Sequence, residues 1–220
     1  MREPLDNKRR EDYMKGLWAN LSQRPASYIP ENPKEIADRI PREDDSDPGK
    51  RYKVGMYGGK FLPFHKGHAH CIDVASSECD ILYVVLFYDI LEGMFSEKLS
   101  KERGVPCHYP SEMKCNVHAR TESILDYIAT KEDNIKLIRI YRTVLPNGEE
   151  DWYAEAEQTK NAIGRKIDAV YSSEPSYSDF FTKAYPQAVH RLIDPERKEV
   201  PISGTKIRSM DPQEAQKWIM

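Results

Sequence analysis

Residues 53–68 read KVGMYGGKFLPFHKGH. The segment begins as a short apolar strand, and the two glycines at its end let the backbone approach a ligand closely. Pro63 then fixes the turn before a stretch in which Ala69 and Ile72 recur at helical spacing. A strand that passes through a glycine turn into a helix N-terminus forms an anion site, because the free amide groups and the helix dipole both attract negative charge.

The alternation of strand and helix continues along the chain. Short β-rich apolar runs occur at residues 53–57, 81–88, 135–141, 167–172 and 188–193. Such strands, separated by amphipathic stretches, are typical of a parallel sheet with crossover helices. We therefore predict an α/β fold, a Rossmann-like doubly wound parallel sheet of about five strands with an N-terminal helical extension.

Three stretches between the later strands have one apolar face each, which predicts helices that pack on the sheet. Their inward residues are Ile124, Leu125 and Ile128; Trp152, Ala156, Thr159 and Ile163; and Tyr177, Phe181 and Ala184. Gly164 is placed to end the second of these helices, and Pro175 to begin the third. A last helix, opened by Asp211 and Pro212, is predicted to bury Ala215.

Residues 1–50 differ in composition from the rest of the chain. They hold six of the fifteen prolines and the charged run at residues 42–47, and this composition resists packing into a core. Tyr13 and Leu17 nevertheless stand at helical spacing. We predict a charged, proline-containing extension with short helices at residues 1–50, followed by one folded domain at residues 51–220.

The bulk composition argues against large charged partners. The 33 basic and 36 acidic residues give a net charge of -3, which creates no field that favours nucleic acid or an anionic membrane. The longest apolar run, residues 81–88, is far shorter than the ~20 residues of a spanning helix, and the N-terminus lacks a hydrophobic signal region. Four scattered cysteines fit a reducing compartment. We expect a cytoplasmic protein.

His65 and His68 stand at the predicted helix start, three residues apart. Both imidazoles can therefore share one face, while Gly67 between them leaves room for a phosphate. Two histidine donors and the fixed charge of Lys60 can stabilise the charge that develops on a transferring α-phosphate. The alternative is a tight turn whose histidines cap the helix or make core hydrogen bonds.

A second cluster follows the last predicted strand. Ser203 is placed as the N-cap of a short helix, and Thr205 and Arg208 share a face of that helix. The serine hydroxyl, the free amides of the first turn and the guanidinium can all bind phosphate oxygens. The alternative is a capping serine beside a surface arginine. Both clusters follow strands of a parallel sheet and so belong at the same edge, which favours the binding interpretation.

These two clusters, residues 59–68 and residues 202–208, together resemble the two signatures of the H-x-G-H nucleotidyltransferase superfamily. Within it, the Gly-Lys-Phe-x-Pro form of the loop, the YSSEP sequence at residues 171–175 and the DPER sequence at residues 194–197 look like NadR-type nicotinamide mononucleotide adenylyltransferases. That pattern usually continues into a kinase domain with a P-loop, and these 220 residues contain no such motif. No kinase activity is therefore expected.

The resemblance implies an enzyme that transfers AMP from ATP to nicotinamide mononucleotide and forms NAD and pyrophosphate, with Mg²⁺ accompanying the ATP. The two signatures recognise the nucleoside triphosphate and not the acceptor substrate. The acceptor could therefore instead be phosphopantetheine, glycerol phosphate or FMN. A non-catalytic module that senses NAD is a further alternative. The resemblance leaves a homo-oligomer open.

The same resemblance assigns roles to particular residues. The catalytic set it implies is His65, His68, Lys60 and Arg208. The ATP-binding set is Gly58, Gly59, Phe61, Gly67, Ser203, Thr205, Ser173 and Glu174. The substrate-binding candidates are Trp152 and Arg120, with Asp89 added because it closes the second strand at the functional edge of the sheet. Each of these three has an alternative: Trp152 as a core residue, Arg120 as a solvated helix arginine and Asp89 as a strand terminator.

Two further patterns carry less weight. Residues 98–101 read KLSK, like the loop of some aminoacyl-tRNA synthetases, but their position after the second strand favours a lid or a charged surface loop. Cys107, His108, Cys115 and His118 are potential zinc ligands within twelve residues. Their spacing lacks a C-x-x-C knuckle, so a loop with free cysteines is the preferred interpretation and no metal site is assigned.

Overall fold

The computed structural model of the chain describes residues 49–89, 113–131, 133–145 and 147–220. Within these ranges one parallel sheet has the strand order β3-β2-β1-β4-β5. The strands are β1 (Tyr52–Gly59), β2 (Cys79–Tyr88), β3 (Ile135–Tyr141), β4 (Ala169–Ser172) and β5 (Val189–Leu192). The predicted doubly wound parallel sheet is confirmed. The extension predicted at residues 1–50 lies almost entirely outside the described residues, as do residues 98–101, Cys107 and His108.

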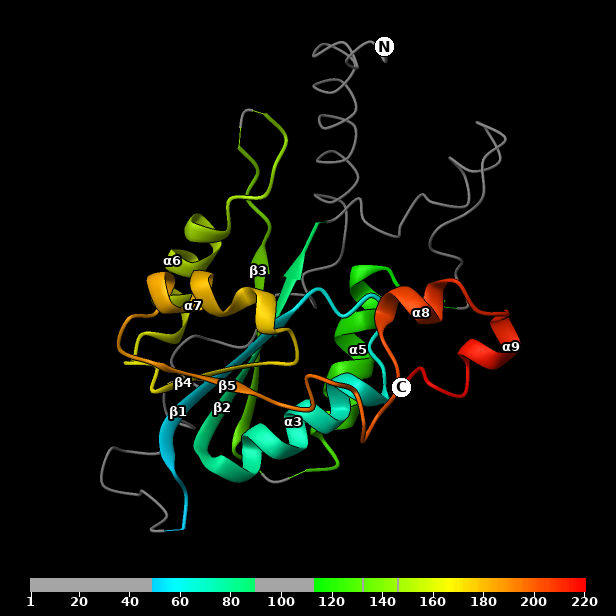
Figure 1. Cartoon of the computed structure of the whole chain (residues 1–220), viewed down its shortest axis with the longest axis horizontal. Coiled ribbons are helices and arrows are strands. Elements are labelled where there is room, and N and C mark those ends of the chain that lie inside the picture. The colour runs from blue at the N-terminus through cyan, green and yellow to red at the C-terminus, as the bar shows by residue number, and fades with distance from the viewer. Residues whose placement is uncertain (1–48, 90–112, 132, 146) are drawn as a thin grey trace, which may run out of the picture. The chain divides into compact units, whose positions relative to one another are not determined.

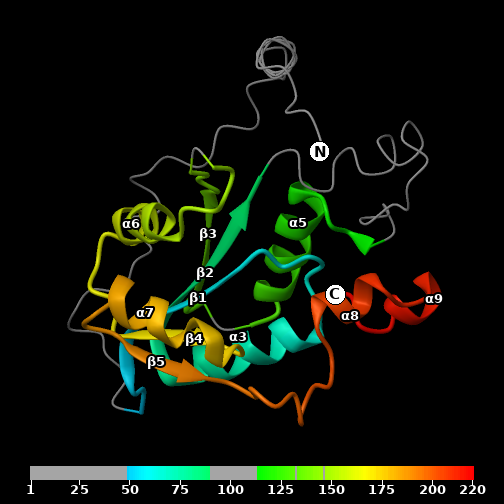
Figure 2. The same cartoon turned by 45° about the horizontal axis from the view of Figure 1, so that its top comes forward.

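Helices cover both faces of the sheet (Figures 1 and 2). They are α3 (Lys66–Glu78), α5 (Val117–Ile128), α6 (Trp152–Ile163), the 3₁₀ turn η3 (Pro175–Tyr177), α7 (Ser178–Ala184), α8 (Gly204–Arg208) and α9 (Pro212–Ala215). Helices α3 and α5 are neighbours, since the Tyr127 hydroxyl donates to Asp73 at 2.6 Å. Helices α6 and α7 are neighbours as well, because the rings of Trp152 and Phe180 have centroids 5.4 Å apart.

The central strand β1 is buried because helices cover it on both sides and strands flank it. Its residues Val54 to Tyr57 are all buried, and Met56 pairs in register with Tyr83 of β2 and Val170 of β4. From β1 the chain winds outward through β2 to β3, then returns to β4 on the opposite side. The order of the sheet therefore reverses between β1 and β4, and such a reversal opens a crevice at the carboxyl ends of these two strands.

Most of the predicted helical faces are confirmed. In α3, Ala69, Ile72 and Ala75 are buried. Gly164 ends α6 in the left-handed conformation with φ of +64°, and the Asp211 side chain caps α9 by accepting a hydrogen bond from the Gln213 amide at 2.9 Å.

Three residues predicted to face inward are exposed. Leu125 is 49% exposed and Trp152 is 40% exposed. The buried residues of α5 are Arg120, Thr121, Ser123 and Ile124. A helix turns by about 100° per residue, which places Leu125 outside this buried stripe. Trp152 is the first residue of α6, where the helix has only just left the loop. Tyr177 also differs from the prediction, because it lies in η3 and is 38% exposed.

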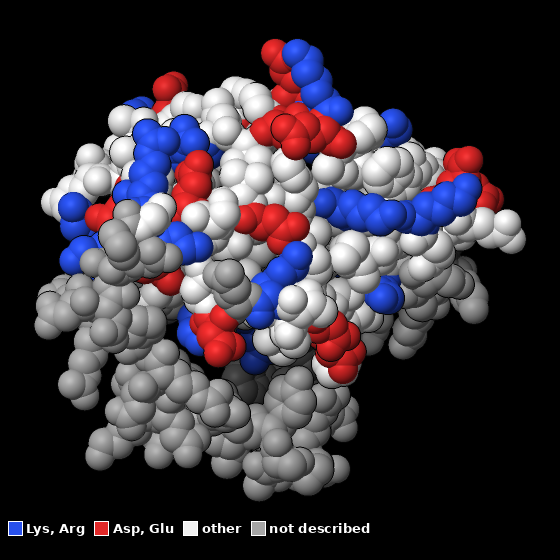
Figure 3. Space-filling view, turned by 90° about the horizontal axis from the view of Figure 1, so that it is seen from below, with Lys and Arg blue, Asp and Glu red and all other residues white. Residues whose placement is uncertain are grey.

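Acidic and basic side chains are interspersed on the face shown in Figure 3, in keeping with the small net charge. No helix within the described ranges combines the length and the apolar character needed to cross a membrane.

Candidate active site

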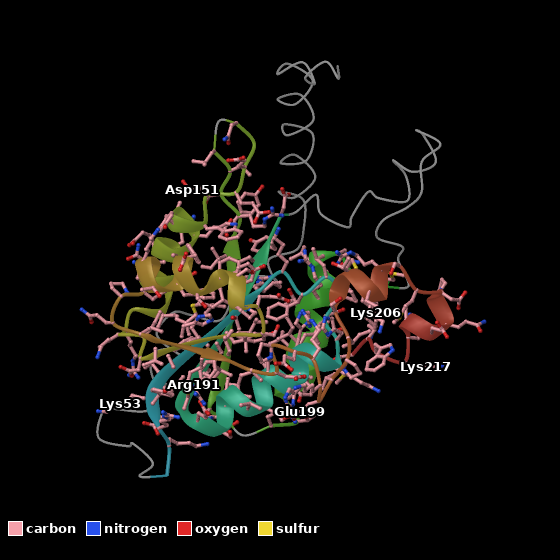
Figure 4. The ribbon with its side chains drawn as sticks, viewed as in Figure 1. Lys53, Asp151, Arg191, Glu199, Lys206 and Lys217 are labelled. Carbon is pink, nitrogen blue, oxygen red and sulfur yellow. The ribbon has the colours of Figure 1, made fainter. Side chains whose placement is uncertain are left out.

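A cavity of about 590 Å³ lies where β1 and β4 end. It is lined by residues from the loop after β1, from the start of α3, from the segment after β4 and from α8. The predicted site residues among them are Gly58, Gly59, Lys60, Phe61, His65, Gly67, His68, Trp152, Ser173, Glu174, Ser203, Thr205 and Arg208. The two sequence clusters thus meet in one cavity. In the view of Figure 4, Asp151 beside α6 and Lys206 on α8 lie on either side of the loop that follows β1.

The two histidines of the loop stack on each other. Their ring centroids are 3.6 Å apart, with 23° between the ring planes. His65 is the N-cap of α3, and its Nδ1 accepts a hydrogen bond from the Gly67 amide at 3.1 Å. In the neutral ring the proton therefore sits on Nε2. The capping interpretation is correct for His65, and the same residue also lines the cavity.

His68 keeps a polar atom available. Its Nδ1 is buried and has no hydrogen-bond partner among the described residues. A buried polar atom without a partner costs about 1–3 kcal/mol, so an incoming polar group at this atom would recover that energy. The ring is held in place by Phe61, which packs edge-on at a centroid distance of 4.9 Å.

Both histidines are neutral at pH 7. Burial, together with the nearby charges of Arg197 and Arg208, lowers the pKa of His65 to about 4. Burial, the neighbouring His65 and Arg197 lower the pKa of His68 well below its usual value. Positive charge in this cavity therefore comes from the arginines and Lys60, while the imidazoles serve as neutral hydrogen-bonding groups.

Arg208 joins α8 to the loop that follows β1. Its guanidinium donates to the carbonyl oxygen of Leu62 and, through Nη2, to the Thr205 hydroxyl at 3.2 Å. Ser203 caps α8 as predicted, accepting from the Lys206 amide at 3.2 Å. A Cβ atom on Gly204 would lie only 2.8 Å from the Leu62 carbonyl oxygen. The glycine therefore allows α8 to approach the loop closely enough for Arg208 to line the same cavity.

Lys60 is paired with a residue that the sequence did not single out. Its ammonium lies 2.5 Å from Oε1 of Glu150. The same oxygen contacts Arg142, and Oε2 accepts from the indole nitrogen of Trp152 at 3.0 Å. Burial raises the pKa of Glu150, but the hydrogen bonds from Lys60 and Trp152 outweigh it, so that the net shift is downward. The carboxylate is charged at neutral pH.

Arg197 is a second functional group that sequence reasoning missed. It lines the cavity, contacts Glu174 and donates through Nη1 to the Ile202 carbonyl at 2.8 Å. Its backbone has φ of +50°. The loop around it is held by Asp194, whose carboxylate accepts from three successive amides at residues 198–200. Arg197 belongs to the DPER sequence that was quoted for the family resemblance. No residue spacing in the sequence indicated that its charge would reach the cavity.

Aromatic side chains form another wall of the cavity. Trp152, Tyr177, Phe180 and Phe181 all line it. The Trp152 ring packs edge-on against Tyr177 and Phe180, at centroid distances of 5.6 and 5.4 Å. With two-fifths of its surface exposed, Trp152 does not occupy the core position that the sequence allowed. Its exposed ring is suited to stacking on a planar ligand.

The sequence model of the cytidylyltransferase-like family matches residues 56–210, most of the chain. The chain belongs to this family. It is 23% identical over 177 residues to the trifunctional NAD biosynthesis/regulator protein NadR of Escherichia coli K12, and 25% identical over 170 residues to the NadR of Salmonella typhimurium. Both matches cover 73% of this chain and 37% of the relative, so the chain spans little more than a third of these proteins. The expected likeness to NadR is confirmed.

Solved structures show the same cytidylyltransferase-like fold. A NadR protein in complex with NR has a TM-score of 0.50 and 22% identity, over 78% of this chain and 44% of that one. A bifunctional NMN adenylyltransferase/ADP ribose pyrophosphatase from Francisella tularensis has a TM-score of 0.51 and 14% identity, over 71% and 41% of the two chains. These structures share the fold, while the family match and the NadR relatives indicate a nucleotidyltransferase domain of the type found in NAD-biosynthesis proteins.

Two predicted site residues of this cytidylyltransferase-like domain do not line the cavity, namely Arg120 and Asp89. Arg120 is fully buried, so the solvated position is wrong; its Nη1 donates to the Lys60 carbonyl at 2.5 Å and supports the loop from behind. Asp89 follows the end of β2. Within the described ranges no group of three His, Cys, Asp or Glu side chains could hold a metal ion. Cys115 is buried, and His118 lies 3.1 Å from Glu122.

Proposed function

We propose that this domain transfers AMP from ATP to nicotinamide mononucleotide and forms NAD and pyrophosphate. The observation that carries the proposal is the cavity in which the stacked His65 and His68 meet Arg197 and Arg208, brought together by two helix starts. Neutral donors and fixed cations in a half-buried cavity match the needs of phosphoryl chemistry, where catalysis comes from positioning and charge stabilisation.

In the proposed reaction a phosphate oxygen of the mononucleotide attacks the α-phosphorus of ATP in line. A new P–O bond forms as the bond to the bridging oxygen of the β-phosphate breaks, and pyrophosphate leaves with that electron pair. The Nε2–H of His65 is free to donate toward a phosphate oxygen, since its Nδ1 is occupied by the Gly67 amide. Arg208 and Lys60 offset the negative charge of the triphosphate.

Mg²⁺ fits this cavity as an ion bound to the phosphates of ATP, and not as one held by protein side chains. The described residues offer no cluster of side chains that could hold a metal, and Mg²⁺ commonly takes phosphate oxygens and water as its ligands. When bound, it would neutralise charge on the phosphates. The protein groups would bind and orient the nucleotides.

The aromatic wall favours a nicotinamide mononucleotide acceptor. The pyridinium ring of this mononucleotide carries a positive charge, and a cation over an indole face is stabilised electrostatically. Trp152 presents such a face, and Glu150 accepts a hydrogen bond from its indole nitrogen. A neutral isoalloxazine or an aliphatic acceptor would not gain from this cation–π contact.

The test is an assay of NAD formation from ATP, Mg²⁺ and nicotinamide mononucleotide. We expect His68→Ala to lose roughly 100-fold or more of the turnover rate, with the folded state retained. His118→Ala, which removes an exposed histidine of α5, is the matched control and should keep the wild-type rate. An undiminished rate in His68→Ala would refute the assigned role.

A panel of acceptors, read by pyrophosphate release, decides between the related reactions. Nicotinate mononucleotide, FMN, phosphopantetheine and glycerol phosphate should each give a lower kcat/KM than nicotinamide mononucleotide. Faster transfer of AMP to another acceptor of the panel would support the adenylyltransferase reaction but refute nicotinamide mononucleotide as its acceptor. Tight NAD binding, with no pyrophosphate released in the presence of any acceptor, would instead favour a non-catalytic module that senses NAD.

A further inference from the structure

We propose that Glu150 is a positioning residue, whose one carboxylate holds the Lys60 ammonium and the Trp152 indole in fixed relation across the cavity. The proposal rests on the proposed function, since it assigns Lys60 to the phosphates and Trp152 to the acceptor ring. Glu150 itself need not touch either substrate.

The contacts use both oxygens of the carboxylate. Oε1 lies 2.5 Å from the Lys60 ammonium, and Oε2 accepts from the Trp152 indole at 3.0 Å. Arg142 contacts Oε1 as well. A rotation of the carboxylate that broke one of these contacts would disturb the others, so the three donors are fixed as a group.

The backbone around Glu150 is held on both sides. Val144 and Glu150 form an antiparallel bridge, and the Asp151 amide donates to the Thr143 carbonyl at 2.8 Å. The next residue, Asp151, caps α6 by accepting from the Ala154 amide at 3.0 Å. Glu150 thus lies between a hairpin and a helix cap, which gives its side chain a fixed origin.

Charge explains why a carboxylate is needed. Lys60 follows β1 and Arg142 follows β3, and both like charges reach the same oxygen. Without an anion between them the two cations would repel, and the flexible stem of Lys60 would turn toward solvent. The side chain of Lys60 is already 40% exposed, against 15% for Arg142, so Lys60 is the group that would move.

The opposite role is also testable. If the ion pair merely kept Lys60 away from the nucleotide, ATP would have to break it. Removal of the Glu150 charge would then raise turnover or lower the KM for ATP. The positioning role gives the reverse sign.

The experiment compares Glu150→Gln and Glu150→Ala with Glu149→Gln. The glutamine variant retains an oxygen for the indole but loses the charge that holds Lys60, so we expect kcat to fall roughly tenfold with the KM for nicotinamide mononucleotide near the wild-type value. Alanine removes both contacts and should raise that KM as well. Glu149 is an exposed neighbour whose carboxylate pairs with Asn147, and its variant should behave as wild type.

A double-mutant cycle with Lys60→Met separates positioning from general loss of stability. If Glu150 acts through Lys60, Lys60→Met should lower kcat by a smaller factor in the Glu150→Gln background than in the wild type. Equal factors in both backgrounds, or a faster Glu150→Gln enzyme, would overturn the proposal.

The Trp152 half of the proposal can be tested without catalysis. Trp18, Trp152 and Trp218 are the tryptophans of the chain, so a Trp18→Phe, Trp218→Phe background isolates the emission of Trp152. In the nucleotide-free protein, Glu150→Ala should red-shift this emission and increase its quenching by acrylamide, while Glu150→Gln should change it little. Unchanged emission in Glu150→Ala would refute the indole contact. A wild-type enzyme with no transfer activity would refute the proposed function instead.

Discussion

Arg208 donates a hydrogen bond to the carbonyl oxygen of Leu62, a residue 146 positions earlier in the chain. This bond joins α8 to the loop after β1, and it brings the guanidinium to the cavity that the two histidines line. The approach is close because position 204 lacks a side chain. The geometry of this cavity therefore depends on one glycine that contacts the loop backbone.

Gly204→Ala should weaken both the fold and the reaction. The new Cβ would lie 2.8 Å from the Leu62 carbonyl oxygen, so α8 or the loop after β1 would have to shift. We expect a loss of about 1–3 kcal/mol in the free energy of unfolding and a fall in kcat/KM. Urea denaturation and steady-state kinetics measure the two effects. Gln213→Ala, on the exposed side of α9, should change neither; unaltered stability in Gly204→Ala would show that the loop moves freely.

The stability of the protein should decrease as the pH falls from about 6.5 toward 4. The pKa of His65 is about 4 in the folded protein and 6.5 in its ordinary state. The unfolded chain therefore binds a proton before the folded one does, which favours unfolding throughout this interval. Above pH 6.5 both states are neutral, and His65 has no effect. Urea unfolding at pH 7 and at pH 5 measures the difference.

His65→Asn is the control for this pH dependence, since asparagine can still cap α3 but does not titrate. Its free energy of unfolding should vary less between pH 7 and pH 5 than that of the wild type. An identical variation in both proteins would assign the effect to other groups.

Arg197→Gln should raise the pKa of both loop histidines, because the positive charge of Arg197 contributes to lowering each of them. The acidic limb of the kcat/KM profile should then move to higher pH, and the KM for ATP should rise as one phosphate-facing cation is lost. NMR titration of the imidazole protons provides a direct reading. Lys198→Gln, at an exposed neighbouring cation, should leave the profile unchanged. A fixed acidic limb in Arg197→Gln would contradict the electrostatic coupling.

Trp152→Ala should raise the KM for the acceptor more than the KM for ATP. Stacking of a nucleobase on an aromatic side chain is worth about 1–3 kcal/mol, and a comparable loss here means roughly a 5- to 150-fold increase in the KM for the acceptor. Initial rates at varied acceptor concentration measure it. Tyr153→Leu removes an adjacent exposed ring that does not line the cavity and serves as the control. Equal increases in both KM values would place Trp152 outside the acceptor subsite.

The sequence predicted well the sheet and the two segments that meet at the cavity, because each depends on local sequence order. Strand periodicity, the glycines of the loop and the Ser203 cap are all readable within about ten residues. The contacts of Lys60 are different, since its partner Glu150 is 90 positions away and has no motif. Arg197 belongs to the DPER sequence at residues 194–197, yet only the folded loop shows that its charge lowers the pKa of both histidines.

The misplaced residues have physical explanations as well. Leu125 was grouped with Ile124, but the buried stripe of α5 is centred on Arg120 and Ile124. Leu125 lies outside that stripe and is exposed. Arg120 appeared to be either a ligand or a surface residue, because a buried arginine is rare. Its burial depends on the Lys60 carbonyl as an acceptor, and no sequence pattern reveals such a backbone partner.

The reversal of strand order between β1 and β4 also governs when the site can exist. The histidines leave the ribosome early, but β4 pairs with β1 only after residue 169 has been made, and Arg208 arrives later still. A nascent chain that carries the complete histidine loop thus still lacks one side of the cavity. The proposed activity would appear only once residues 169–208 have docked onto a strand formed near the beginning of the domain.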